Sequence, residues 1–225
     1  MNDLSNFNTE VNKQLKDKFK SEKWSGVCPK FYKNDIPNLI KCIEIRKLIK
    51  QDGFYCFLSV YSNFNNSNSP KGKMTYTNKQ IFLVTLTPDK VTDSSYVWPL
   101  KDDKDFNTHQ INLLWKAISS HGEHFFTSFN NFPNPFLDIK PIDFNKGKVK
   151  LFSKYEVFSQ VNYMNFLKEI HVSLNQIETA TTFSNLAIKS YYKNLEGKNI
   201  IHNKTYKKAF EEYLRFLEMP KLKNS

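Results

Sequence analysis

Two strand-like runs separated by an Asp-Gly pair constrain the fold of this chain more than any other feature. Residues 43–46 alternate apolar and charged side chains, and residues 54–61 form a second run rich in aromatic and β-branched residues. Asp52-Gly53 lies between the two runs and is a strong signal for a tight turn. The sequence therefore predicts an antiparallel β-hairpin over residues 43–61.

Helical periodicity marks both ends of the chain. Apolar side chains recur every three or four residues from Leu4 to Phe19, and the same spacing returns after residue 162. Asn162 and Thr205 are the expected N-caps of the later helices. Further strands are expected at residues 79–87, 95–100 and 148–161. One internal helix is expected to begin after Asp102-Asp103 and to end at Gly122.

These elements predict an α+β fold with a mostly antiparallel sheet, or a small Greek-key barrel of the OB type, and C-terminal helices packed on it. The expected domain organisation is an N-terminal helical segment at 1–30, a β-rich core domain with one internal helix at 31–161, and a C-terminal helical extension at 162–225. With six glycines and no phosphate-loop motif, a classical nucleotide-binding fold is not expected.

The sequence composition indicates in which cellular compartment the protein is expected. No run of about 18 apolar residues is present, and the first 24 residues resemble neither a secretory signal nor a mitochondrial presequence. We expect an intracellular protein, nuclear or cytoplasmic, that is neither secreted nor bound to a membrane. Cys28, Cys42 and Cys56 have no Cys-x-x-Cys spacing, so reduced core thiols are expected and a zinc site is not.

The formal net charge of +11 is concentrated at the two ends. Residues 1–50 hold 11 Lys and Arg against 6 Asp and Glu, residues 51–188 hold 13 against 12, and residues 189–225 hold 9 against 4. Such an excess is typical of proteins that bind polyanions, because neutralised phosphates release counterions. A codon bias explains the same lysines equally well, since only Arg46 and Arg215 are arginines.

The second hairpin strand suggests a binding surface. Its alternate residues place Tyr55, Phe57 and Tyr61 on one face. If that face is open, its rings can stack on bases while nearby lysines follow the phosphates; if it is buried, the rings belong to the core. The residues expected to bind nucleic acid are Lys41, Arg46, Lys47, Lys50, Tyr55, Phe57, Tyr61, Lys71 and Lys73.

Two shorter patterns suggest metal chemistry. Pro88-Asp89 followed by Asp102-Asp103-Lys104 matches the spacing of PD-(D/E)xK nucleases, in which two carboxylates hold Mg²⁺ and a lysine polarises water. Asp89, Asp102 and Lys104 would be catalytic there, although a charged helix start explains the second half as well. His121-Gly-Glu-His124 lacks a further ligand, so no metal site is expected.

The function expected from the sequence is non-catalytic binding of nucleic acid, single-stranded DNA or RNA being favoured, on the aromatic and basic face of the hairpin. Two alternatives remain open. The chain is an accessory subunit of a larger protein or ribonucleoprotein assembly, or it is a Mg²⁺-dependent nuclease of the PD-(D/E)xK type. No cofactor is expected except Mg²⁺ under the nuclease alternative.

Overall fold

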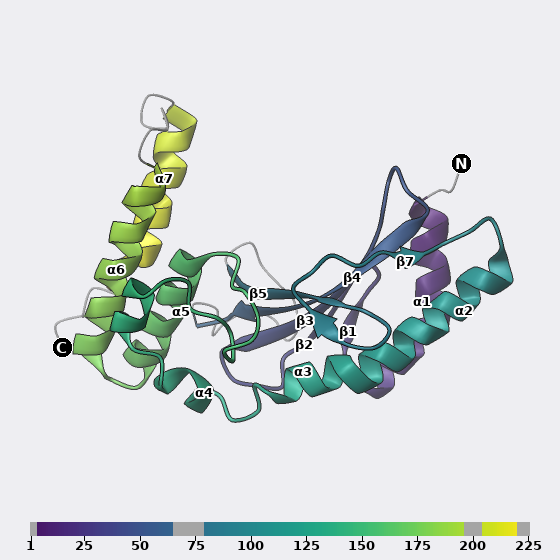
Figure 1. Ribbon diagram of the computed structural model, residues 1–225, viewed down its shortest axis with the longest axis horizontal. Helices are drawn as coiled ribbons and strands as arrows, with labels where there is room; N and C mark the ends of the chain where they lie inside the picture. The colour runs from purple at the N-terminus through teal and green to yellow at the C-terminus, as the bar shows by residue number, and fades with distance from the viewer. Residues whose placement is uncertain (1–3, 65–78, 196–203, 220–225) are drawn as a thin grey trace. The chain divides into compact units, whose positions relative to one another are not determined.

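The computed structural model describes residues 4–64, 79–195 and 204–219 of the 225-residue chain (Figure 1). The chain divides into two compact units: unit 1 comprises Met1–Pro135 and Lys150–Glu156, and unit 2 comprises Phe136–Val149 and Val157–Ser225. An N-terminal helix, a mostly antiparallel sheet and C-terminal helices are present. The α+β class expected from the sequence is therefore confirmed.

An open antiparallel sheet forms the centre of unit 1. Its strands follow the order β1-β2-β3-β4-β5-β6, and β7 pairs with β4. From β1 to β6 each strand pairs with the next along the chain, so this part of the sheet is an open meander and not the closed Greek-key barrel considered above. The strands are β1 (Ser25–Val27), β2 (Lys30–Lys33), β3 (Leu39–Lys47), β4 (Gly53–Ser62), β5 (Lys79–Leu86), β6 (Val91–Thr92) and β7 (Trp98–Pro99).

The expected hairpin is confirmed as β3 and β4. Their register pairs Ile43 with Leu58 and Lys47 with Phe54, and the turn closes through Leu48 N donating to Gly53 O at 2.9 Å. A Cβ atom at Gly53 would lie 2.4 Å from Val97 Cγ1, so β7 can pair here only because residue 53 lacks a side chain. The expected strand at 79–87 is confirmed as β5, whereas the expected strand at 95–100 is reduced to β7.

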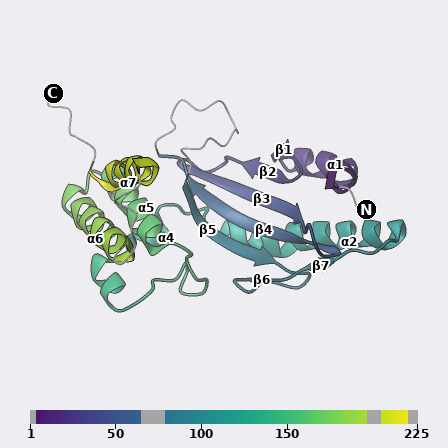
Figure 2. The same ribbon diagram turned by 90° about the horizontal axis from the view of Figure 1, so that it is seen from above.

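Helices cover one face of this sheet (Figures 1 and 2). The Phe7 ring packs 5.3 Å from Phe54, and Phe82 packs 5.9 Å from Phe129. Gly122 does not end the internal helix as expected, because its φ of −66° and ψ of −49° continue the helical path. The helices of this layer are α1 (Leu4–Ser21), α2 (Lys104–Ala117), the π-helix η1 (Ile118–Gly122) and α3 (Glu123–Thr127).

The strand expected at residues 148–161 is absent. Its only ladder contact is an isolated bridge between Leu151 and Tyr155, closed by a turn in which Phe152 and Ser153 have φ of 51° and 58°. A positive φ cannot continue a strand, so the alternating pattern breaks at this turn. The chain then enters a helix at residue 160, capped by Ser159 and not by Asn162.

Unit 2 is helical. The pair α5 and α6 forms its centre, and α7 joins them through the buried Lys168, whose ammonium donates to the last carbonyls of α7. None of the described helices is long and apolar enough to cross a membrane. The remaining helices of the described chain are α4 (Asn134–Leu137), η2 (Pro141–Asn145), α5 (Gln160–Ser173), α6 (Ile177–Leu195) and α7 (Lys204–Leu217).

The three cysteines are free and buried, as expected. Burial raises the pKa of Cys28 and of Cys42 to about 12, and it raises that of Cys56 as well. A folded thiol therefore keeps its proton after the unfolded thiol, with a pKa near 8.5, has lost it. The contribution of these thiols to the free energy of unfolding should be constant below about pH 8.5 and fall above it, by about 1.4 kcal/mol per pH unit for each thiol.

Urea unfolding at pH 7.5, 9 and 10 measures this loss, and Cys56→Ala should make it shallower. A free energy of unfolding that stays constant up to pH 10 would contradict the assignment of three protonated core thiols.

Candidate functional site

The two faces of β4 have different surroundings. Phe54 contacts α1 through Phe7, and Leu58 faces Gly122 of the π-helix, so these side chains point into the helix-covered core. Side chains alternate along a strand, and Tyr55 and Phe57 therefore point to the opposite face. Both are half-buried, whereas Phe54 and Leu58 are fully buried. The aromatic face predicted for this strand thus lies opposite the helices.

A short aromatic and cationic cluster occupies this opposite face. The ring centroids of Tyr55 and Phe57 lie 5.3 Å apart, and the guanidinium carbon of Arg46 lies 5.9 Å from the Phe57 ring. Antiparallel pairing brings them together, because Arg46 on β3 lies directly opposite Tyr55 on β4. The side chain of Arg46 is 59% exposed, so the guanidinium is accessible to solvent.

Glu44 fixes the two cations of this cluster. Its buried carboxylate accepts from Arg46 Nη2 at 2.6 Å and from Arg46 Nε at 3.1 Å, and it lies 3.8 Å from Lys30 Nζ. Lys30 on β2 pairs directly with Glu44 on β3. One carboxylate is shared between two cations, so the group keeps an excess positive charge beside the rings.

Tyr61, although on the same face, does not reach this surface. It is 8% exposed and packs with Ile40 and Cys42, while Tyr32 lies partly buried against them. Burial raises the pKa of Tyr61 to about 12, as expected for a phenol removed from water. The face is therefore accessible at Tyr55 and Phe57 and closed at Tyr61, which belongs to the core.

The predicted lysines are dispersed. Lys41 and Lys47 are buried and point to the helix-covered face; Lys41 Nζ lies 3.0 Å from an Asp35 carboxylate oxygen and 5.9 Å from the Phe126 ring centroid. Lys50 is exposed in the hairpin turn. Lys71 and Lys73 lie outside the described residues. Among the predicted cations that the structure describes, Arg46 is the one that lies beside the rings of Tyr55 and Phe57.

Lys30 joins the cluster although the sequence analysis did not single it out. Little in the sequence indicated it, because Lys30-Phe31-Tyr32-Lys33 is short and does not alternate strictly between apolar and polar side chains. Recognising it required the pairing of β2 with β3, and no turn motif between them indicates that register. Lys30, Arg46, Tyr55 and Phe57 are hereafter called the sheet-face cluster.

The residues of the nuclease pattern are not brought together. Asp103 caps α2, its Oδ1 accepting from Asp105 N at 2.9 Å and from Phe106 N at 3.0 Å. Asp89 directly precedes Lys90, and Lys90 lines one cavity together with His121. A hydrogen bond from Thr87 and the charges of Lys90 and His121 lower the pKa of Asp89. His121 follows Lys104 by 17 helical residues, about 25 Å along the axis. Asp102 and Lys104 therefore lie at the opposite end of this helix from Asp89.

No three His, Cys, Asp or Glu side chains among the described residues are grouped so that they could hold a metal ion.

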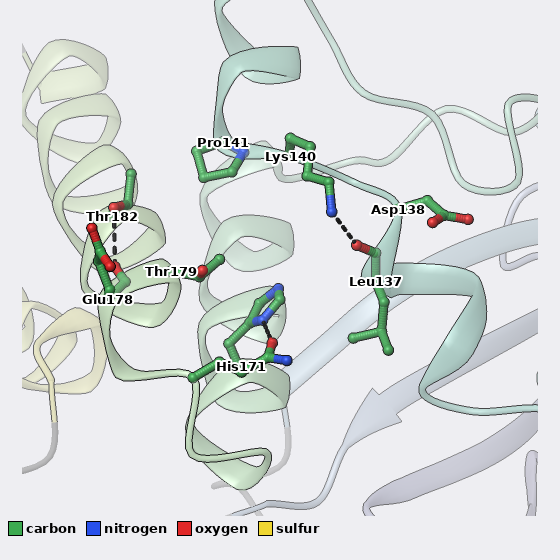
Figure 3. A pocket seen from close by; sticks show the side chains of 9 residues that line it. Leu137, Asp138, Lys140, Pro141, His171, Glu178, Thr179 and Thr182 are labelled. Carbon is green, nitrogen blue, oxygen red and sulfur yellow. Dashed lines mark hydrogen bonds between the residues drawn. The ribbon is translucent and has the colours of Figure 1, made fainter.

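Unit 2 contains a polar pocket of about 680 Å³ between the 137–141 segment and helices α5 and α6 (Figure 3). His171 lines it; Nδ1 lies 2.5 Å from Gln176 Oε1, and Nε2 is buried without a hydrogen-bond partner among the described residues. The ammonium of Lys140 donates to Leu137 O at 2.9 Å. Asp138 and Glu178 also line the pocket, so its lining carries charges of both signs and favours no single class of ligand.

No family model, curated protein or solved structure matches this chain, and the comparisons therefore assign it to no family.

Proposed function

We propose that unit 1 binds single-stranded nucleic acid on the sheet face opposite the helices. The observation that carries the proposal is the sheet-face cluster, in which the adjacent rings of Tyr55 and Phe57 are accessible and lie beside Arg46 and Lys30. Aromatic rings on an open sheet face bind unstacked bases, and neighbouring cations bind the phosphates that link them. No reaction is assigned to this surface.

The geometry suggests how the cluster would work. Two rings with centroids 5.3 Å apart offer platforms for two successive bases, each stacking contact contributing about 1–3 kcal/mol. The exposed guanidinium of Arg46 can exchange Glu44 for a phosphate, because both are anionic acceptors that match its donor fork. A duplex keeps its bases stacked on one another, so single strands should bind more tightly than duplexes.

The proposal predicts that Tyr55→Ala/Phe57→Ala weakens binding of a single-stranded oligonucleotide at least tenfold, since two stacking contacts of about 1 kcal/mol or more are lost. Fluorescence anisotropy with single-stranded DNA, RNA and duplex DNA measures the affinity, and circular dichroism checks the fold. Phe158→Ala is a matched control, because Phe158 is a 96% exposed ring in unit 2. An unchanged affinity in the folded double variant would refute the proposed surface.

The same anisotropy measurement at several salt concentrations tests the role of the cations of the sheet-face cluster, Lys30 and Arg46. Arg46→Gln should reduce the slope of log affinity against log salt by about one phosphate contact. Lys116→Gln, on the exposed side of α2, removes the same charge elsewhere and should leave the slope nearly unchanged. Equal effects of both variants, or no binding at low salt, would favour the alternative of an accessory subunit whose lysines reflect composition alone.

A further inference from the structure

A cavity in unit 1, smaller than the one in unit 2, has an unusual lining. It measures about 270 Å³ and lies between the turn after β5, the helical segment η1–α3 and the turn at residues 151–155. Lys90, His121, His124 and Lys154 line it from these three segments, together with the hydroxyl-bearing Ser128. Among the described residues, no carboxylate lines it. With the phenol of Tyr155, six side chains able to donate hydrogen bonds to an anion therefore surround one small space.

The backbone around the cavity is held in place on two sides. Thr87 Oγ1 donates to the carboxylate of Asp89 at 2.6 Å and contacts the carbonyl of Lys90 at 3.0 Å, which fixes the turn that carries Lys90. His121 lies in the π-helix, and His124 follows in α3. Short π-helical segments are rare and occur frequently at functional sites, because the wider turn redirects side chains.

The third side is a strained turn. Phe152 has φ of 51° and Ser153 φ of 58°, a conformation that bulky side chains rarely adopt. The Phe152 ring centroid packs 5.0 Å from that of Phe129, and the ammonium of Lys154 lies 5.0 Å from the Tyr155 ring. These contacts hold the turn against the helical layer and direct Lys154 to the cavity. Backbone strain of this kind clusters at sites that bind ligands.

The nearest carboxylate of the turn after β5 is that of Asp89, which is exposed and outside the lining. Thr87 lowers the pKa of Asp89 by a hydrogen bond, so this carboxyl is ionised and offsets part of the charge near His121. Asp93, whose carboxylate accepts from Glu156 N at 3.3 Å, also lies beside the turn at 151–155 but outside the lining. The described lining itself carries two lysines and no carboxylate. The cavity therefore favours an anion.

We propose that this cavity binds the phosphate group of a small phosphate monoester. Lys90 and Lys154 supply charge, and His121, His124 and Ser128 supply further hydrogen-bonding groups, as phosphate oxygens require. The partly buried Phe152 ring gives the organic part of the ester an apolar wall. The volume of about 270 Å³ is slightly below the usual range for pockets of drug-sized ligands, which fits a phosphorylated sugar and excludes an oligomer. The site is separate from the sheet-face cluster.

Calorimetric titration of the full chain with ribose 5-phosphate, inorganic phosphate and ribose tests this assignment at low ionic strength. We expect saturable binding of ribose 5-phosphate at one site, weaker binding of inorganic phosphate, and none of ribose. Lys90→Gln/Lys154→Gln should weaken the binding of ribose 5-phosphate at least tenfold, because two charge-assisted contacts are lost. Both lysines are exposed, so the variant should fold normally.

The matched control is Lys16→Gln/Lys116→Gln, which removes the same charge from exposed positions of α1 and α2. We expect this control to bind ribose 5-phosphate as the unmodified protein does. Equal weakening by both double variants would show a diffuse attraction between a basic protein and any anion, and would overturn the proposed site. Absence of saturable binding in the unmodified protein would overturn it as well.

Discussion

Phe19→Ala is expected to lower the free energy of unfolding of unit 1 by about 3–5 kcal/mol, the usual loss for truncating a buried phenylalanine. Phe19 is 1% exposed and contacts three further aromatic residues. Its ring stacks on Phe31 of β2 with centroids 3.8 Å apart, and it meets Trp115 of α2 edge to face at 5.2 Å. One ring thus joins the N-terminal helix, the sheet and the internal helix.

Urea unfolding followed by tryptophan fluorescence suits this variant, since Trp24 also lies 6.1 Å from the Phe19 ring. Lys16→Ala, an exposed change on the same helix, should alter the free energy of unfolding by less than about 0.5 kcal/mol. If Phe19→Ala cost no more than this control, α1 would be an appendage of the sheet and not part of its core.

Lys168→Met should destabilise unit 2 by about 2–4 kcal/mol and release the C-terminal end of α7. The side chain of Lys168 is 1% exposed, and its ammonium donates to Phe216 O at 2.9 Å and to Glu218 O at 3.0 Å. It also lies 3.0 Å from a carboxylate oxygen of Glu169. Methionine fills the same space but leaves the helix carbonyls and the carboxylate without their donor, and unpaired buried polar groups are costly.

Limited proteolysis should therefore cut α7 faster in Lys168→Met than in the unmodified protein, and urea unfolding should give the loss of free energy. Lys189→Met removes an exposed ammonium from α6 and should change neither result. A Lys168→Met variant as stable as this control would mean that hydrophobic packing alone holds α7 in place, without help from the ammonium.

The hairpin could be predicted because its information is local. Asp52-Gly53 marks the end of the turn, whose loop occupies residues 48–52, and the alternation of residues on either side indicates the register. The accessibility of each aromatic residue could not be predicted in this way. Tyr55 and Tyr61 occupy equivalent positions in the alternating pattern, but Tyr61 is packed against Ile40 and Cys42. The exposure of each ring depends on which other segments pack against that end of the sheet face. The sequence of the strand alone does not specify those contacts.

Which lysines lie beside the rings was still more difficult to predict from the sequence. Lys41 and Lys47 were expected beside the rings, but both occupy positions on β3 that point to the helix-covered face. Arg46 occupies a position of the alternate set and points to the opposite face. Counting residues from the turn would have separated the two sets. Recognising Lys30 required a contact between strands that no local motif specifies.

The path of the chain between the two units decides which fragments of the gene encode a whole unit. Residues 136–149 belong to unit 2, yet the chain returns to unit 1 at residues 150–156, where Tyr155 meets Phe125 with ring centroids 5.6 Å apart. A gene fragment ending at residue 135 would encode unit 1 without the turn that covers Phe125 and Phe129. Unit 1 is therefore not encoded by one uninterrupted stretch of the gene, because residues 136–149 separate the turn at 150–156 from the rest of it.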